Sequence, residues 1–310
     1  MDRVSTSGLY GSVITNLMTA QSAQADAGAQ VSSQKKATDL KGFGSQAQTL
    51  TAMQTVQSQI QTYLDQSQLT SSKLSVQDSA MTQISDSVTA ARKAIADALA
   101  SGSGDTLMQA MGTSFQNGVS ALNTTYNGQY LFAGGQVNTK PVTATAMTDL
   151  TTAPSIASLF QNDQHITATQ IDQNTSIKTG FVADQLGTGM LNAFQSIQSF
   201  SEGANGPFTG KLTTAQTTFL QSQLAVFDSV STGLTTAQAQ NGLMQSQLSS
   251  TQTDLGSRST TMQGLIGNIT DADLAQASAN LTQAQQAVQA SAQVFASLRS
   301  SSLVSLLPVA

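Results

Sequence analysis

The sequence predicts a mainly α-helical protein. We expect a long antiparallel, coiled-coil-like helical rod built from both chain ends, with a small β-rich or irregular domain inserted in the middle. Three observations lead to this prediction. Apolar residues recur every seven positions in long stretches on both sides of the chain, the middle contains short segments separated by turn residues, and charged residues make up only 9% of the sequence.

The C-terminal segment, residues 266–307, carries an apolar seam at heptad spacing. Arg299 is the only charged residue after Leu274, so the charges that usually fix pairing in a free-standing coiled coil are missing. We therefore expect a helix surrounded by other helices, most simply in an assembly; the alternative is a helix buried in its own domain. Thr270 and Asp273 precede the seam at capping-box spacing. Two rows form the seam: Leu274, Leu281, Val288 and Phe295, then Ala277, Ala284, Ser291 and Leu298.

The N-terminal segment, residues 4–31, has the same character. Val13, Leu17 and Val31 lie at helical spacing among Ser and Gln residues. The two end segments could pair with each other. Because neither buries enough apolar surface alone to offset its ordering entropy, we expect both to be largely unfolded in the isolated chain.

Three further helical stretches lie inside the ends. Residues 46–100 follow one heptad register with Ser67 as its polar exception, and a shorter helix is expected at 106–123. Helix resumes at about residue 213, with Asn241 inside an apolar seam, where a lone Asn often sets the register or partner choice. The alternative is that Gly242 beside it marks a local weakness, and the sequence leaves both interpretations open.

Glycines and lysines mark the expected breaks between these helices. We expect Gly264 and Gly267 to separate the helix that contains Asn241 from the final one. Residues 32–45 are expected to be a turn, with Lys35, Lys36 and Lys41 on its solvated surface.

The middle of the chain has a different pattern. Residues 127–135 read Asn-Gly-Gln-Tyr-Leu-Phe-Ala-Gly-Gly, which indicates a turn, a short strand and a second turn. Residues 136–209 are expected to be a separate module, mostly β or irregular, with strands near 166–171 and 176–182.

The composition argues against several classes of function. A net charge of -5 and a pI of about 4.6 argue against binding to nucleic acid or anionic membranes. The chain has no Cys and one His, His165, so we predict no catalytic, cofactor or metal site. Asp271 and Asp273 are interpreted as acids at a helix start rather than calcium ligands. An enzyme within 136–209 would need a polar pocket around His165.

Six stretches of the sequence match a known pattern: residues 3–17, 127–135, 271–275, 281–285, 287–290 and 302–307. They resemble the bacterial flagellin superfamily, and within it the hook-associated proteins of the hook–filament junction. Two features depart from that pattern: the ending at 303–307 looks closer to filament flagellins, and the region after Ser32 lacks the family's usual turn. The alternative is therefore a filament subunit, or a flagellin-like surface protein with a binding role.

The resemblance implies an organisation and a set of partners. Residues 1–40 and 268–310 would be terminal assembly helices, 41–135 with 210–267 the helical rod, and 136–209 a variable outward-facing insert. The partners would be other copies of the chain, a neighbouring hook-associated protein, flagellin and an export chaperone, with no nucleic acid and no membrane. The protein would be extracellular, exported unfolded by flagellar type III secretion without a cleaved signal peptide.

The expected assembly interface comprises the apolar positions of the two end segments. Their seams are the faces that we expect to contact each other and neighbouring copies. The interface residues are Val13, Leu17, Val31, Leu274, Leu281, Val288, Phe295, Leu298, Leu303, Leu306 and Leu307.

Overall fold

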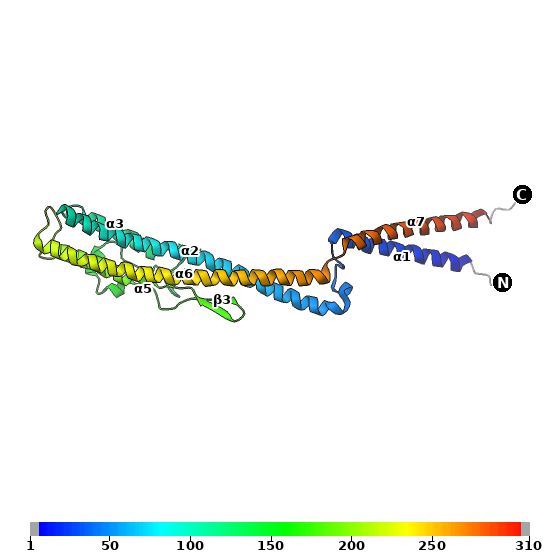
Figure 1. Ribbon diagram of the computed structural model, residues 1–310, viewed down its shortest axis with the longest axis horizontal. Coiled ribbons are helices and arrows are strands. Elements are labelled where there is room, and N and C mark those ends of the chain that lie inside the picture. The colour runs from blue at the N-terminus through cyan, green and yellow to red at the C-terminus, as the bar shows by residue number, and fades with distance from the viewer. Residues whose placement is uncertain (1–5, 305–310) are drawn as a thin grey trace. The chain divides into compact units, whose positions relative to one another are not determined.

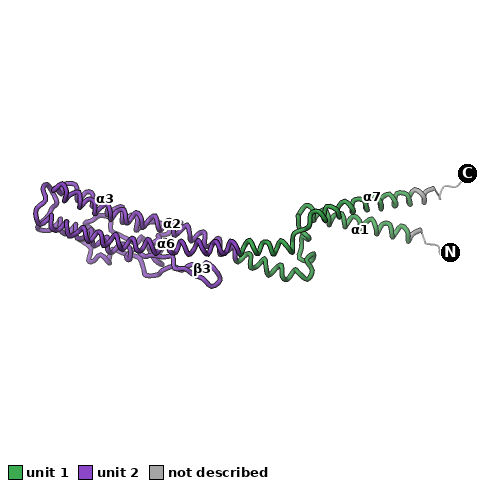
Figure 2. Tube along the Cα trace, in the orientation of Figure 1, with its two compact units in different colours: residues 1–59, 258–310 green, residues 60–257 purple. Residues whose placement is uncertain are grey.

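The computed structural model describes the backbone of residues 6–304 and the side chains of residues 8–299. It is mainly helical, as predicted, and it divides into two compact units (Figure 2). One unit contains residues 1–59 and 258–310, and the other contains residues 60–257. The long helices α2 (Ala47–Ser101) and α6 (Thr214–Thr270) contribute residues to both units.

The first unit also contains helix α1 (Thr6–Ser33), the short 3-10 helix η1 (Leu40–Gln46) and helix α7 (Leu274–Val304). Figure 1 shows α1 and α7 running side by side. Where they meet the connecting segments, the backbone N–H of Lys36 donates to the carbonyl of Thr270 at 2.7 Å, and that of Ala272 donates to Gln34 at 2.9 Å. Hydrogen bonds therefore join two segments more than 200 residues apart in the sequence.

The lysines of the connection do more than face solvent, which was the expectation. The Lys35 ammonium lies 2.6 Å from the Asp271 carboxylate, and that of Lys36 donates to the carbonyl of Asn268 at 2.9 Å. Both side chains remain exposed. They hold the turn after α1 against the connection between α6 and α7.

The boundary between the last two helices differs from the prediction. Helix α6 continues through Gly264 and Gly267 to Thr270, because a helical Gly costs only about 1 kcal/mol relative to Ala and two of them do not stop a 57-residue helix. The predicted capping box is also wrong. Asp273 alone caps α7, accepting from the backbone N–H groups of Ala275 at 2.9 Å and Gln276 at 3.1 Å, whereas Thr270 belongs to α6.

In the second unit, α2 and α6 pack as antiparallel neighbours around the heptad positions predicted for them. Arg92 donates two hydrogen bonds to Asp228, and Gln77 donates to Asn241. The polar residue Ser67 is buried in its seam. The fully buried heptad residues are Leu74, Met81, Val88 and Ile95 of α2, and Leu220, Phe227, Leu234, Leu248 and Leu255 of α6.

Two antiparallel hairpins complete the β content. Strands β1 (Thr125–Tyr126) and β2 (Gln129–Tyr130) are joined by Asn127 and Gly128, both with positive φ, as in a type I′ turn. Strands β3 (Ala168–Asp172) and β4 (Thr175–Lys178) confirm the predicted strands near these positions. Ile171 and Ile177 fix the β3–β4 hairpin by packing against Leu74 of α2 and Leu248 of α6.

The remaining elements of this unit are helical. They are α3 (Leu107–Leu122), α4 (Thr148–Thr152), the 3-10 helix η2 (Ile156–Leu159) and α5 (Ala183–Glu202). Helix α5 was not predicted, since residues 136–209 were expected to be mostly β or irregular. It buries Met190, Phe194 and Ile197 in the main core, where the Phe194 ring packs edge-on against the rings of Phe115 and Phe227.

Candidate assembly surface on the terminal helices

Helices α1 and α7 pair through a heptad seam within one chain. The side chains that face the seam are buried or half-buried, and every side chain between them on α1 from residue 14 to 23 is exposed. The tightest points are four alanines that allow the backbones to approach. On α1 the seam contains Tyr10, Val13, Leu17, Ala20, Gln24, Ala27 and Val31; on α7 it contains Ala277, Leu281, Ala284, Val288, Ser291, Phe295 and Leu298.

Aromatic packing and a long-range hydrogen bond hold one end of the seam. The Tyr10 hydroxyl donates to the backbone carbonyl of Leu298 at 2.8 Å, and its ring lies edge-on to Phe295 with 6.3 Å between centroids. The start of α1 therefore lies beside the end of α7, so the two helices are antiparallel.

The ion pair of Lys35 and Asp271 holds the other end. The hydrogen bond from the Lys35 ammonium, followed by that from the Thr270 hydroxyl, keeps the pKa of Asp271 below its ordinary value. Both side chains of the pair are about half exposed, so water screens the attraction between them. The pair therefore orients the two connecting segments more than it stabilises the folded unit.

Between these two ends, a groove of about 380 Å³ runs along the helix pair. Its walls are alanines and amides, including Ala23, Gln30, Asn280 and Ala287, with Asp26 as its only charged residue. Small side chains on both walls leave room for side chains of another helix. The groove therefore offers a shallow, nearly uncharged contact surface.

The structure places most of the predicted interface residues in the seam itself. Each of these is half-buried against the opposite terminal helix of its own chain. Leu274 is exposed at the start of α7. The side chain of Leu303, and Leu306 and Leu307 entirely, lie outside the described residues. The seam residues are Val13, Leu17, Val31, Leu281, Val288, Phe295 and Leu298.

Sequence reasoning missed a second set of apolar side chains, which lie off the seam. Met18 is 65% exposed, and Leu9, Ile14 and Val294 are each at least 40% exposed. Ile14 and Met18 are four residues apart and share one face of α1. Their spacing is visible in the sequence, but the heptad pattern beside it is stronger and these residues are not in the predicted interface.

The described residues contain no other arrangement with the geometry of a reactive centre. No group of three or more His, Asp or Glu side chains in residues 8–299 comes close enough to hold a metal ion. His165 is exposed, and no described serine or carboxylate forms a hydrogen bond with its ring. None of the helices, over their described residues, is long and apolar enough to cross a membrane.

Two sequence families match the two ends of the chain. The bacterial flagellin N-terminal helical region matches residues 4–137, and the bacterial flagellin C-terminal helical region matches residues 224–307. The first match contains α1, α2, α3 and the β1–β2 hairpin; the second contains most of α6 and all of α7. A search of the curated proteins finds no match.

Solved structures show the same fold. One is a flagellar hook-associated protein from Vibrio parahaemolyticus, at 13% identity and a TM-score of 0.58, with 72% of this chain and 96% of that chain covered. Another is FlgL from Bacillus cereus, at 14% identity and a TM-score of 0.53, with 70% of this chain and 98% of that chain covered. With both terminal regions matched, the chain belongs to the bacterial flagellin family of flagellar structural proteins.

Proposed function

We propose that this protein is a non-enzymatic structural subunit that forms the junction between the flagellar hook and the filament. It would assemble with copies of itself and contact a neighbouring hook-associated protein on one side and flagellin on the other. The observation that carries this proposal is the second apolar face of the terminal helices. Met18, Ile14 and Val294 remain exposed after the seam has been filled by the chain's own helices.

The energetics of the terminal helices favour growth on a template. The four seam residues that are fully buried are alanines, which release little free energy on burial. A pair of helices held by half-buried contacts is marginal alone, because ordering each residue costs about 1–2 kcal/mol. Burying Met18 and Ile14 against a neighbour would add about 1.5–3 kcal/mol for each side chain. We therefore propose that α1 and α7 become fully ordered only on incorporation.

We propose that different parts of the chain have different roles in the assembly. Residues 1–40 and 268–310 would form the assembly layer, 41–135 with 210–267 the supporting helical layer, and 136–209 the outward-facing insert. Export through the flagellar type III apparatus, with a chaperone and without a cleaved signal peptide, belongs to the same proposal. The absence of Cys removes disulfides that would hinder transport of an unfolded chain.

Residues 127–135 favour a junction protein over a filament subunit. They resemble the signature of hook-associated junction proteins, and each part of the segment has a defined place. Asn127 and Gly128 form the β1–β2 turn, Phe132 is fully buried in the core, and the backbone N–H of Gly135 donates to Asp163.

Immunogold electron microscopy of isolated flagella tests the proposal. An antibody raised against residues 136–209 should label a single band where hook meets filament. Label along the whole filament would contradict the junction role and identify a filament flagellin. Label spread over the cell body, with flagella unlabelled, would instead support the surface-protein alternative. Flagella from a strain that lacks the protein provide the control for antibody specificity.

A further inference from the structure

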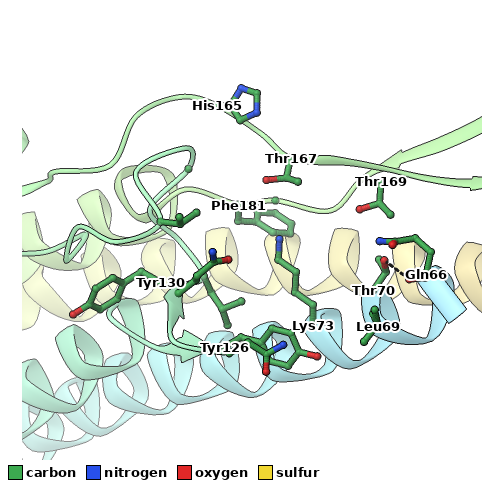
Figure 3. Close-up of a pocket in the computed structure, with 16 residues that line it drawn as sticks. Gln66, Leu69, Thr70, Lys73, Tyr126, Tyr130, His165, Thr167, Thr169 and Phe181 are labelled. Carbon is green, nitrogen blue, oxygen red and sulfur yellow. Dashed lines mark hydrogen bonds between the residues drawn. The ribbon is translucent and has the colours of Figure 1, made fainter.

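A pocket of about 270 Å³ lies in the second unit, apart from the terminal helices (Figure 3). Three elements meet around it: α2, the β1–β2 hairpin, and the segment that leads into β3. Tyr126 and Tyr130 come from the hairpin, Thr167 and Thr169 from the β3 side. The pocket is therefore built by segments that are far apart in the sequence, and its shape depends on the folded unit.

Lys73 of α2 is the one primary amine in this pocket. Its side chain is half-buried, and in Figure 3 it extends from α2 into the space beneath Phe181 and Thr167. Within residues 8–299, no hydrogen bond or ion pair reaches its ammonium group. Burial lowers the pKa of Lys73, because its charge is removed from water without a compensating anion. Lysines in proteins usually reach water or pair with an acid. The N–H donors of the Lys73 ammonium group are therefore available to bind an anion.

The rest of the lining contains no acidic side chain. Its polar groups are hydroxyls and amides, such as those of Thr70, Gln66 and Gln129, together with the His165 imidazole. The neighbouring carboxylate of Asp163 is not part of the lining and accepts hydrogen bonds from the backbone N–H groups of Gly135 and His165. A chain with more acidic than basic residues thus places a basic group in a pocket whose lining contains no Asp or Glu side chain.

We propose that this pocket binds the carboxylate of a small hydroxylated molecule, with Lys73 as the counter-ion. An ammonium–carboxylate hydrogen bond is charge-assisted and stronger than a neutral one. Hydroxyl and amide groups both donate and accept, so they suit a ligand rich in hydroxyls. The aromatic ring of Tyr126 offers an apolar surface for the body of the ligand. A volume near the lower limit of ligand pockets, about 300 Å³, fits a molecule the size of one sugar ring.

The test is calorimetric titration of the full-length protein with D-glucuronate and, in parallel, with D-glucose. The two probes differ mainly in one carboxylate. We expect glucuronate to bind at least about tenfold more tightly than glucose, the factor that 1.4 kcal/mol of differential interaction gives. Lys73→Met keeps the length of the aliphatic stem and should remove that preference. Lys178→Met is the matched control, because Lys178 is exposed on β4 and outside the lining.

Each outcome of these titrations either supports or overturns the proposed site. Loss of glucuronate binding in Lys73→Met, with binding kept in Lys178→Met, would establish the site for a free small molecule. If glucuronate does not bind, sedimentation velocity of the same variants asks whether the carboxylate comes from a neighbouring copy. Weaker self-association in Lys73→Met alone would overturn the small-molecule proposal in favour of a carboxylate from a neighbouring copy. Equal binding of the two sugars, or equal effects of the two substitutions, would overturn the proposal, as would no effect in either assay.

Discussion

The side-chain amide of Gln77 donates to the Oδ1 atom of Asn241 at 3.1 Å, and both residues are fully buried between α2 and α6. Asn241 in turn donates to the backbone carbonyl of Leu74 and to the Asp78 carboxylate. A polar layer inside an apolar seam tolerates only the register that pairs these groups. A register-setting role for Asn241 was one of two interpretations that its position left open, and its partner on α2 is Gln77.

Replacing Asn241 with Leu should therefore destabilise the second unit. The Gln77 amide would be left buried without an acceptor, at a cost of about 1–3 kcal/mol in the free energy of unfolding. Urea unfolding followed by circular dichroism measures this change. The double variant Gln77→Leu with Asn241→Leu should recover most of the loss, because two apolar groups no longer need partners. A double variant less stable than either single one would contradict the pairing.

An acidic residue at Met18 should prevent assembly without unfolding the subunit. Met18→Asp places a charge on the exposed apolar face of α1, where burial against a neighbour would leave it unpaired at a cost of several kcal/mol. We expect at least about tenfold less incorporation into flagella, measured by immunoblotting of isolated filaments. Asn16→Asp adds the same charge at an exposed position that, two residues from Met18, lies on another face of α1. Equal loss with both substitutions would argue against a specific surface.

Removing residues 279–310 should separate folding from assembly. The fragment loses most of α7 and with it the partner of α1, whereas the core of the second unit is intact. We expect a soluble, largely helical protein that is absent from the flagellum. Circular dichroism and fractionation of sheared flagella provide the two measurements. Normal incorporation of the fragment would defeat the assembly mechanism proposed for the terminal helices.

Substitution of Gly134 should be costly for a local reason. Gly134 has a φ of 68°, and an added Cβ atom would collide with the backbone and carboxylate of Asp163. Gly134→Ala is expected to lower the free energy of unfolding by about 1–3 kcal/mol. Gly112→Ala is the matched control, since Gly112 lies in α3 with open space around its Cβ position, and Ala favours a helix by up to about 1 kcal/mol. The control should be neutral or stabilising.

Acid should weaken the second unit through Asp149 and Asp163. Hydrogen bonds from backbone N–H groups, of Thr145 to Asp149 and of Gly135 to Asp163, lower the pKa of each carboxyl from its ordinary 3.8. The unfolded chain therefore binds these protons more readily than the folded one, and the free energy of unfolding rises with pH in the acid range. The contribution is complete above 3.8 and disappears as the pH falls through the lowered values.

Urea unfolding at about pH 6 and about pH 3 measures this dependence. Asp163→Asn should be less stable at the higher pH and should lose less stability on acidification than the unaltered protein. If Asp163→Asn has the same pH dependence as the unaltered protein, Asp163 does not contribute through its ionisation.

The long helices could be predicted from the sequence because their signal is local and repeated. The register of Leu74, Met81 and Val88 is visible in the sequence alone, and all three are fully buried. Helix α5 could not be predicted in the same way. Gly187 lies inside it and lowers its helix propensity, and an added Cβ there would meet the side chains of Leu122 and Phe160. The glycine is needed because side chains from other elements pack closely against this position. Helix propensity is a local property and does not report such a contact.

The candidate surface was predicted only in part. The heptad rows identified which faces of α1 and α7 are apolar, yet periodicity does not distinguish a seam filled by the same chain from one that awaits a neighbour. Val288 and Phe295 pack against the opposite helix of the same chain, whereas Met18 is exposed and is proposed to contact a neighbour. The pocket around Lys73 was not predictable, because its walls come from α2, β2 and the approach to β3 and converge only after folding.

The contact between Tyr10 and Leu298 spans 288 positions of sequence. A chain made from its first residue onward exposes α1 long before its partner exists, so this pairing is the last step that biosynthesis permits. Pairing of α1 with α7 closes a loop that contains nearly the whole polypeptide. The entropy lost in closing this loop is offset only by the contacts that form when the two helices meet. The order of synthesis therefore leaves α1 without its partner helix until every segment between α1 and α7 has been made.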